Sequence, residues 1–251
     1  MATAVQDKGA AIVTGASRGI GAAIASRLAS DGYGVIVNYA ADASGADSVV
    51  SAITGTGGKA VAVQADVGSE ADVAVMFDRA REQMGPVTVL VNNAGGAGER
   101  TRIDEQHSDA LARLMQVNVV GPMLCAKHAV RTMSTARGGK GGSIVTIASI
   151  AAKAPAGAPG LIPYEATKGA MVTFARSLSN EVASEGIRSN SVSPGVIATD
   201  LTPQDLRESL GQQAPMGRIG QPGEIAATVS WLVSPEASFV TGTDITVSGG
   251  I

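Results

Sequence analysis

A tyrosine and a lysine four positions apart, Tyr164 and Lys168, are the residues whose types and spacing point most directly to chemistry. They lie in a run with helical periodicity, and residues i and i+4 of a helix share one face. A free phenol titrates near ~10, too high for efficient proton transfer at neutral pH, and a nearby ammonium lowers that pKa. The pair is therefore a candidate acid/base device, although unrelated neighbours on a helix surface would show the same spacing.

The elements that must position this pair alternate along the chain. Short apolar runs alternate with helical patterns, which predicts a parallel sheet with helices on both faces. We expect one doubly wound α/β domain over residues 1–251, with a parallel sheet of about seven strands and ligands bound outside the strands' carboxyl ends. The predicted strands are 10–14, 35–39, 60–64, 87–91, 143–148, 187–193 and 243–247, and the clearest predicted helices are 70–84 and 222–233.

A glycine-rich turn follows the first predicted strand and opens a helical pattern. A strand, a glycine turn and a helix together point free N–H groups and a helix dipole at a phosphate. The chain contains 32 glycines, so the position of the turn carries this prediction more than its spacing does. We expect a dinucleotide pyrophosphate here, contacted by Gly15, Ser17, Arg18, Gly19, Ile20 and Gly21.

The second predicted strand ends where an acidic residue would hold the ribose 2′-hydroxyl of NAD. The residue there is Asn38, and the next acid, Asp42, lies beyond it in the loop. Arg18 can approach the same ribose, and a guanidinium favours a 2′-phosphate that a carboxylate would repel. We therefore expect NADP(H) to be preferred, with NAD(H) possible if Arg18 is only solvated.

Further polar and small residues follow other strands. Asp66 and Val67 end the third strand, where Asp66 either reaches the adenine amino group or begins a turn and caps the next helix. Small residues after the fourth strand let the backbone approach a flat ligand, and paired asparagines there can tie strand ends together. We expect cofactor contacts from Asn93, Ala94 and Gly95.

Two more polar residues precede the tyrosine. Asn118 lies among core-type residues of a long helix, where it either bridges backbone groups or holds an ordered water. Ser149 follows the fifth strand, where a serine is also a common strand-end cap. The segment 150–163 is expected to be a pocket-shaping loop, and 201–218 a mobile helical lid or an ordinary helical excursion.

Bulk composition excludes several functions. A net charge of −3 and the lack of a basic stripe argue against nucleic acid or an anionic membrane as the main partner. Cys125 is the only cysteine and there are two histidines, so we expect neither a disulfide framework nor a metal site. The first residues do not match a leader sequence and no apolar span is long enough to cross a bilayer, which predicts a cytoplasmic protein.

Taken together, these residues resemble the short-chain dehydrogenase/reductase family over essentially the whole chain. The chain is similar to the group that includes 3-oxoacyl-(acyl carrier protein) reductases and sugar or aldehyde dehydrogenases. Each motif alone is weak, but their order and their placement on strand ends are specific. The matching pieces are Thr14 to Gly21, Asp66-Val67, Asn92 to Gly95, Asn118, Ser149, Tyr164 with Lys168, and Pro194-Gly195.

The resemblance implies a Rossmann-type fold and catalytic roles for four residues. Tyr164 would donate a proton to the carbonyl oxygen as hydride arrives from the nicotinamide, and Lys168 would bind the nicotinamide ribose and lower the tyrosine pKa. Ser149 would orient the carbonyl, and Asn118 would hold a water in the proton relay. The resemblance also implies that Gly195, Ile197 and Thr199 line the nicotinamide carboxamide, that Pro194 contacts the cofactor, and that the chain forms a homotetramer.

Three departures from the family pattern weaken a substrate assignment. Fifteen positions separate Ser149 from Tyr164, which is longer than usual; Ala148 replaces a frequent serine; and Glu165 stands where a small residue is common. The expected partner is a small carbonyl or alcohol substrate. Alternatives are a sugar or steroid with NAD(H), or a non-catalytic dinucleotide-sensing protein, which would not need Ser149, Tyr164 and Lys168 together. A nucleotide-sugar epimerase fits the glycine spacing less well.

Overall fold

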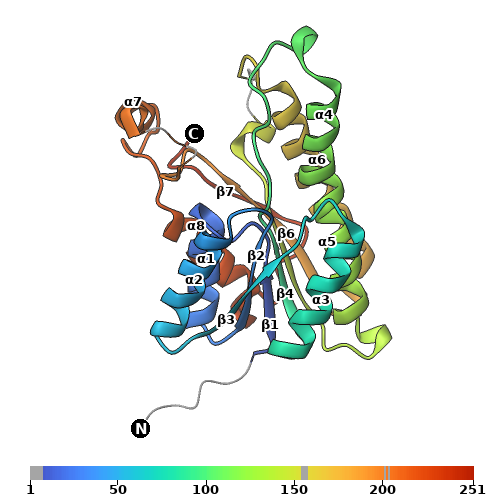
Figure 1. The fold of residues 1–251 in the computed structure, drawn as a ribbon. Coiled ribbons are helices and arrows are strands. Elements are labelled where there is room, and N and C mark those ends of the chain that lie inside the picture. Colours follow the sequence, from blue (N-terminus) through green and yellow to red (C-terminus); the bar gives the residue numbers. More distant parts are fainter. Residues whose placement is uncertain (1–7, 154–157, 201, 203) are drawn as a thin grey trace.

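The computed structural model describes residues 8–153, 158–200, 202 and 204–251. These residues form a seven-stranded parallel sheet in the order β3-β2-β1-β4-β5-β6-β7 (Figure 1). This confirms the predicted doubly wound α/β fold. The strands are β1 (Ala10–Val13), β2 (Gly34–Tyr39), β3 (Lys59–Gln64), β4 (Val87–Asn92), β5 (Gly142–Ile147), β6 (Ile187–Pro194) and β7 (Asp244–Val247).

Helices cover both faces of the sheet, as Figure 1 shows. One face carries α1 (Gly19–Ser30), α2 (Ala43–Gly55) and α8 (Pro222–Val233), and the other carries α3 (Glu70–Met84), α5 (Gly121–Met133) and α6 (Ile162–Val182). Two helices, α3 and α8, begin at the predicted residues, Glu70 and Pro222. Ser69, which was not singled out from the sequence, caps α3 by accepting the N–H of Asp72, and Pro222 occupies the first turn of α8.

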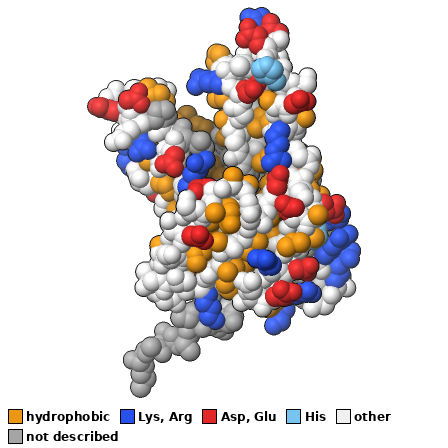
Figure 2. Space-filling model, in the orientation of Figure 1, with side chains coloured by type: hydrophobic (Ala, Val, Ile, Leu, Met, Phe, Trp, Pro, Cys, Tyr) orange, Lys and Arg blue, Asp and Glu red, His pale blue; other side chains and the backbone are white. Residues whose placement is uncertain are grey.

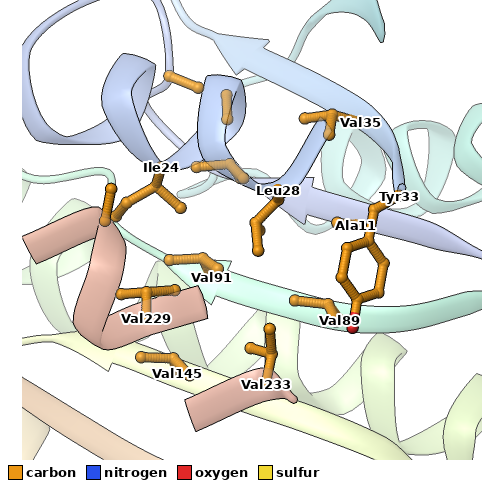
Figure 3. Packing of buried hydrophobic residues seen from close by; sticks show 14 of the residues in the cluster. Ala11, Ile24, Leu28, Tyr33, Val35, Val89, Val91, Val145, Val229 and Val233 are labelled. Carbon is orange, nitrogen blue, oxygen red and sulfur yellow. The ribbon is translucent and has the colours of Figure 1, made fainter. Parts of the chain in front are cut away.

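Alternate residues of each central strand feed the two cores. In β1, Ala11 and Val13 belong to the α1–α8 side, whereas Ala10 and Ile12 belong to the α3–α5 side. All four are fully buried, as expected for a parallel strand covered on both faces. Figure 3 shows the first core, where Leu28 of α1 and Val229 of α8 lie over the valines of β4 and β5.

The reversal of strand order opens a crevice at the carboxyl ends of the strands. Chain segments leave β1 in one direction and β4 in the other, which is where ligands bind in open α/β sheets. Two further helices, α4 (Ser108–Met115) and α7 (Arg207–Gln212), rise beyond the sheet on opposite sides of this end (Figure 1). Figure 2 shows the surface hollowed between them.

Parts of two predicted segments lie outside the described residues. In the predicted pocket loop these are residues 154–157, and in the predicted lid they are Leu201 and Pro203. The rest of the lid segment contains a short 3₁₀ turn, Gln204–Leu206, and α7. Within the described part of the chain, no helix combines the length and apolarity needed to span a membrane, and no cluster of three or more metal-ligating side chains occurs.

Candidate active site

A cavity of about 750 Å³ lies at the carboxyl ends of the strands. It brings together residues from the first strand-to-helix turn, from the ends of β2 to β6 and from α6. Asn118 is the one predicted site residue that does not line it. Those that do are Gly15, Ser17, Arg18, Gly19, Ile20, Gly21, Asn38, Asp66, Val67, Asn93, Ala94, Gly95, Ser149, Tyr164, Lys168, Pro194, Gly195, Ile197 and Thr199.

The glycine turn is pressed against the end of β4. A side chain on Gly15, whose φ is +61°, would place its Cβ 2.8 Å from the Cα of Ala94. A Cβ on Gly21 would lie 2.4 Å from the carbonyl oxygen of Gly15. The turn therefore requires glycine at both positions. It leads into α1, whose first N–H groups have no acceptor within the helix, so the residues present suit a phosphate.

Asn93 ties the two strand ends together, as the sequence predicted for the asparagine pair. Its side-chain amide donates to the carbonyl oxygens of Thr14 and Gly15 at 2.9 and 3.0 Å. In return, the Thr14 hydroxyl accepts the N–H groups of Asn93 and Ala94. These bonds fix the floor of the cavity between β1 and β4.

Asn38 has protein partners where the sequence predicted a ribose contact. Its side chain is buried, and its amide nitrogen donates to the carbonyl oxygens of Val63 and Ala65 at 3.3 and 3.0 Å. Its Oδ1 accepts the N–H of Gly15 at 3.1 Å. Asn38 therefore pins the glycine turn to β3. The bonds cross 23 to 27 residues of chain, so sequence spacing did not reveal them.

The end of the cavity beside β2, where the sequence predicts the adenosine half of a dinucleotide, contains a carboxylate beside Arg18. Asp42 caps α2 by accepting the N–H of Gly45 at 3.0 Å, and it lines the cavity. This hydrogen bond, together with those from Ser17 and Ser44 and the nearby charge of Arg18, lowers the pKa of Asp42. Tyr39, Ala40 and Ala41 also line this end, and their position at the carboxyl end of the second strand was the available sequence signal.

Asp66 begins a turn, one of the roles that the sequence left open, but Ser69 and not Asp66 caps the next helix. Its Oδ1 accepts the N–H of Gly68 at 2.9 Å, so it does begin a turn. Its Oδ2 lies 2.8 Å from Nη2 of Arg113 on α4, and both side chains line the cavity. Arg113 was not singled out from the sequence.

Asn118 lies behind the cavity wall in a π-helical turn, Gln116–Val120. Its Oδ1 accepts the N–H of Gly96, and its Nδ2 donates to the Gly96 carbonyl oxygen and to Oγ1 of Thr167. Asn118 thus bridges backbone groups, the first alternative considered for it. Both amide hydrogens are used, while Oδ1 keeps capacity for one further donor.

Ser149, Tyr164 and Lys168 meet at the other end of the cavity. Ser149 follows β5, and its Oγ accepts the N–H of Ala151 at 3.1 Å. Tyr164 and Lys168 project from the same face of α6, with the Lys168 Nζ 5.7 Å from the centre of the Tyr164 ring. That Nζ is buried and donates to the carbonyl oxygen of Ile147 at 2.9 Å.

Burial dominates the protonation of this pair. It raises the pKa of Tyr164, although a hydrogen bond with Ser149 acts in the opposite direction. It also lowers the pKa of Lys168 to about 8. The direction for Tyr164 is opposite to the lowering expected from the sequence. The physical reason is that the ammonium lies over the ring and is directed at Ile147, while the phenol loses its hydration.

Glu165, an unexplained departure at the sequence level, has a structural partner. Its Oε1 accepts the N–H of Ala158 at 2.7 Å. The carboxylate therefore holds the end of the segment that leads from Ser149 to Tyr164. Arg207 acts similarly on the other wall, donating to the carbonyl oxygens of Thr199 and Thr202.

Comparisons with known proteins agree with this geometry. A family model described as enoyl-(acyl carrier protein) reductase matches residues 15–251. An uncharacterised oxidoreductase of Methylorubrum extorquens is 42% identical over 247 residues, covering 96% of each chain. Glucose 1-dehydrogenase 2 of Bacillus subtilis is 39% identical, covering 96% of this chain and 93% of its own. A 3-oxoacyl-(acyl carrier protein) reductase of Synechocystis is 38% identical, covering 96% of each.

Solved structures of dehydrogenases have the same fold as this chain. A short-chain dehydrogenase of Burkholderia cenocepacia in complex with NADP superposes with a TM-score of 0.90 at 34% identity, covering 99% of each chain. A 7α-hydroxysteroid dehydrogenase complexed with NADH gives a TM-score of 0.89 at 33% identity, covering 97% of this chain and 94% of its own. The chain belongs to the short-chain dehydrogenase/reductase family. It is an oxidoreductase of that family, acting on CH–OH donors.

Proposed function

We propose that this protein interconverts an alcohol with a ketone or aldehyde, using NADP(H), with Tyr164 as the general acid/base. One observation carries the proposal. Ser149, Tyr164 and Lys168 converge at one end of a cavity whose other end is the glycine turn at the start of α1. A dinucleotide placed with its phosphates at that turn would extend toward Tyr164.

The chemistry follows from the protonation and position of these groups. A bound nicotinamide supplies or accepts the hydride. Burial keeps the Tyr164 phenol protonated at neutral pH, the form that can give its proton to the carbonyl oxygen during reduction. The Ser149 hydroxyl and the Lys168 ammonium are donors held in place by Ala151 and Ile147, so developing negative charge meets groups already oriented.

Asn118 supports this site from behind. It holds Gly96 and Thr167, and the free lone pair of its Oδ1 is where a relay water could donate. A Cβ on Gly95 would lie 3.0 Å from that oxygen and 3.8 Å from Nζ of Lys168. Asn118 and Lys168 therefore flank the same glycine, and we propose that water connects them.

The preference for NADP(H) rests on Arg18. Arg18 lines the adenosine end, and the second strand supplies no acid at Asn38. Relatives of known structure bind NADP in one case and NADH in another. We expect Arg18→Ala to weaken NADPH far more than NADH, and Asp42→Asn, which removes the neighbouring anion, to strengthen NADPH. Equal losses of both cofactors in Arg18→Ala would show that Arg18 does not read a 2′-phosphate.

The catalytic proposal is tested by Tyr164→Phe. Turnover should fall by at least about a hundredfold, because proton transfer by a positioned group typically contributes that much. Fluorescence titration should show NADPH still bound. Tyr33→Phe is the matched control, since Tyr33 lies away from the cavity, in the core between α1 and α8. Turnover of Tyr164→Phe near the wild-type rate would refute the mechanism.

The substrate class is best found with a carbonyl panel followed by NADPH oxidation. The named relatives act on a sugar, an acyl thioester and a steroid, so 3-oxoacyl thioesters, aldoses, steroid ketones and aromatic aldehydes belong in one experiment.

We propose a homotetramer in the cytoplasm. Met115, Val120 and Met123 on the α4–α5 face and Phe239 near the C-terminus are exposed apolar side chains that subunit contact would cover. Light scattering should report four times the chain mass.

A further inference from the structure

Arg113 is a charged side chain in the cavity that the proposed chemistry does not use. It lies on α4, four positions before Val117, and both residues line the cavity, as does Asp66. Its Nη2 is 2.8 Å from Oδ2 of Asp66, at the end of β3. The ion pair thus spans the cavity rim from the helix to the sheet. The arginine side chain is 54% exposed and the aspartate 35%, so both remain accessible to a ligand.

The surrounding contacts hold the guanidinium in place. Gln116, on the next turn, donates from Nε2 to the carbonyl oxygen of Gly68 at 2.7 Å. A Cβ on Gly68 would lie 3.1 Å from Nη1 of Arg113 and 3.0 Å from Cγ of Gln116. The turn after β3 is therefore packed directly against these two side chains. Asp66 is fixed from the other side, because its Oδ1 accepts the Gly68 N–H and its own N–H donates to Asp72.

We propose that Arg113 is an adenine-binding residue, which orients Asp66 toward the adenine amino group and offers its own planar guanidinium to the ring. A surface ion pair of this kind contributes little to folding, so stability alone gives it no clear purpose. A guanidinium held at one edge by a carboxylate keeps its face free to stack on an aromatic ring. Because Asp66 neutralises its charge, Arg113 suits the uncharged base better than a phosphate.

This inference rests on the proposed function, since it requires a dinucleotide in the cavity. The test compares Arg113→Met with the wild type by fluorescence titration of NADPH, NADH and reduced nicotinamide mononucleotide, which lacks the adenosine half. We expect NADPH and NADH to bind roughly 3- to 10-fold more weakly to the variant, the size of a lost cation–π and hydrogen-bonding contact. The mononucleotide should bind both proteins equally, which also shows that the variant is folded.

Arg102→Met is the matched control. Arg102 also pairs with an aspartate, Asp104, but it does not line the cavity, so its removal changes the net charge equally and should leave all three affinities unchanged. Unchanged dinucleotide binding in Arg113→Met would overturn the inference. A loss confined to NADPH would overturn it in favour of a 2′-phosphate contact, and an equal loss for the mononucleotide in favour of a general structural role. A wild-type protein that binds none of the three would overturn the proposed function itself.

Discussion

Replacing Lys168 with methionine should stop turnover and yet stabilise the folded protein without cofactor. The ammonium of Lys168 is buried at the wall of the cavity, and its hydrogen bond goes to a neutral carbonyl, that of Ile147. Burial without a compensating negative charge is costly for a cation. The lowering of the Lys168 pKa from 10.5 to about 8 expresses that cost.

The size of the expected stabilisation follows from the pKa of Lys168. A depression of this size corresponds to roughly 3 kcal/mol of penalty on the charged form. Methionine removes the penalty but leaves Ile147 without its donor, which costs about 1 kcal/mol. We expect the free energy of unfolding at neutral pH to rise by ~1–2 kcal/mol. For a domain of this size, that raises Tm by roughly 3–6 °C.

The pH dependence of stability shows whether the buried charge of Lys168 is the cause of this difference. The folded-state pKa of Lys168 lies below the unfolded value, so between about pH 8 and about pH 10.5 the unfolded chain binds the extra proton. Wild-type stability should therefore rise with pH across this window relative to Lys168→Met, and the advantage of the variant should shrink. Urea titrations at about pH 7 and about pH 9.5 measure the difference directly.

Lys140→Met is the matched control because Lys140 is exposed, so the same substitution there removes no buried charge. Its free energy of unfolding should stay within about 0.5 kcal/mol of the wild type at both pH values. The reasoning is refuted if Lys168→Met is less stable than the wild type at neutral pH, or if the gap between them is the same at both pH values.

Two further predictions concern the neighbours of Lys168. Because burial raises the pKa of Tyr164, the rate of carbonyl reduction should not increase as pH rises from about 7 to about 9. The rate of alcohol oxidation, which needs the phenolate, should increase over the same range. Initial rates in both directions measure this, and an oxidation rate independent of pH would contradict it. Glu165→Ala should raise the KM for the carbonyl substrate roughly 3- to 10-fold, because it releases the N–H of Ala158. Glu165→Gln should keep a KM near the wild-type value, because its amide oxygen still accepts that hydrogen bond. Equal effects of the two variants would show that the negative charge matters instead.

The fold was predictable because its signals are local. Strands buried on both faces read as apolar runs, and Pro222 marks the start of α8 at the residue where the structure begins it. The carboxyl ends of parallel strands share one edge of the sheet, so most candidate site residues could be placed in one cavity from strand order alone.

The partners of individual side chains were not predictable in this way. Asn38 was placed correctly at the end of β2, but its bonds run to β3 and to the glycine turn. Asn118 bonds to Gly96 and, 49 residues away, to Thr167. Arg113 was missed because an arginine on a helix is usually solvated, and only the packing of α4 against the turn after β3 brings it to Asp66. These contacts depend on tertiary geometry that spacing does not encode.

The proposed catalytic pair, Tyr164 and Lys168, shows the same limit in its electrostatics. Helical spacing correctly placed Tyr164 beside Lys168, but a pairwise argument counts only the attraction between phenolate and ammonium. In the folded protein both groups lose water, and desolvation favours the neutral form of each, raising one pKa and lowering the other. The site therefore holds a protonated phenol next to an ammonium whose pKa is lowered to about 8. In the mechanism proposed above, a protonated phenol is the form that donates a proton to a carbonyl oxygen.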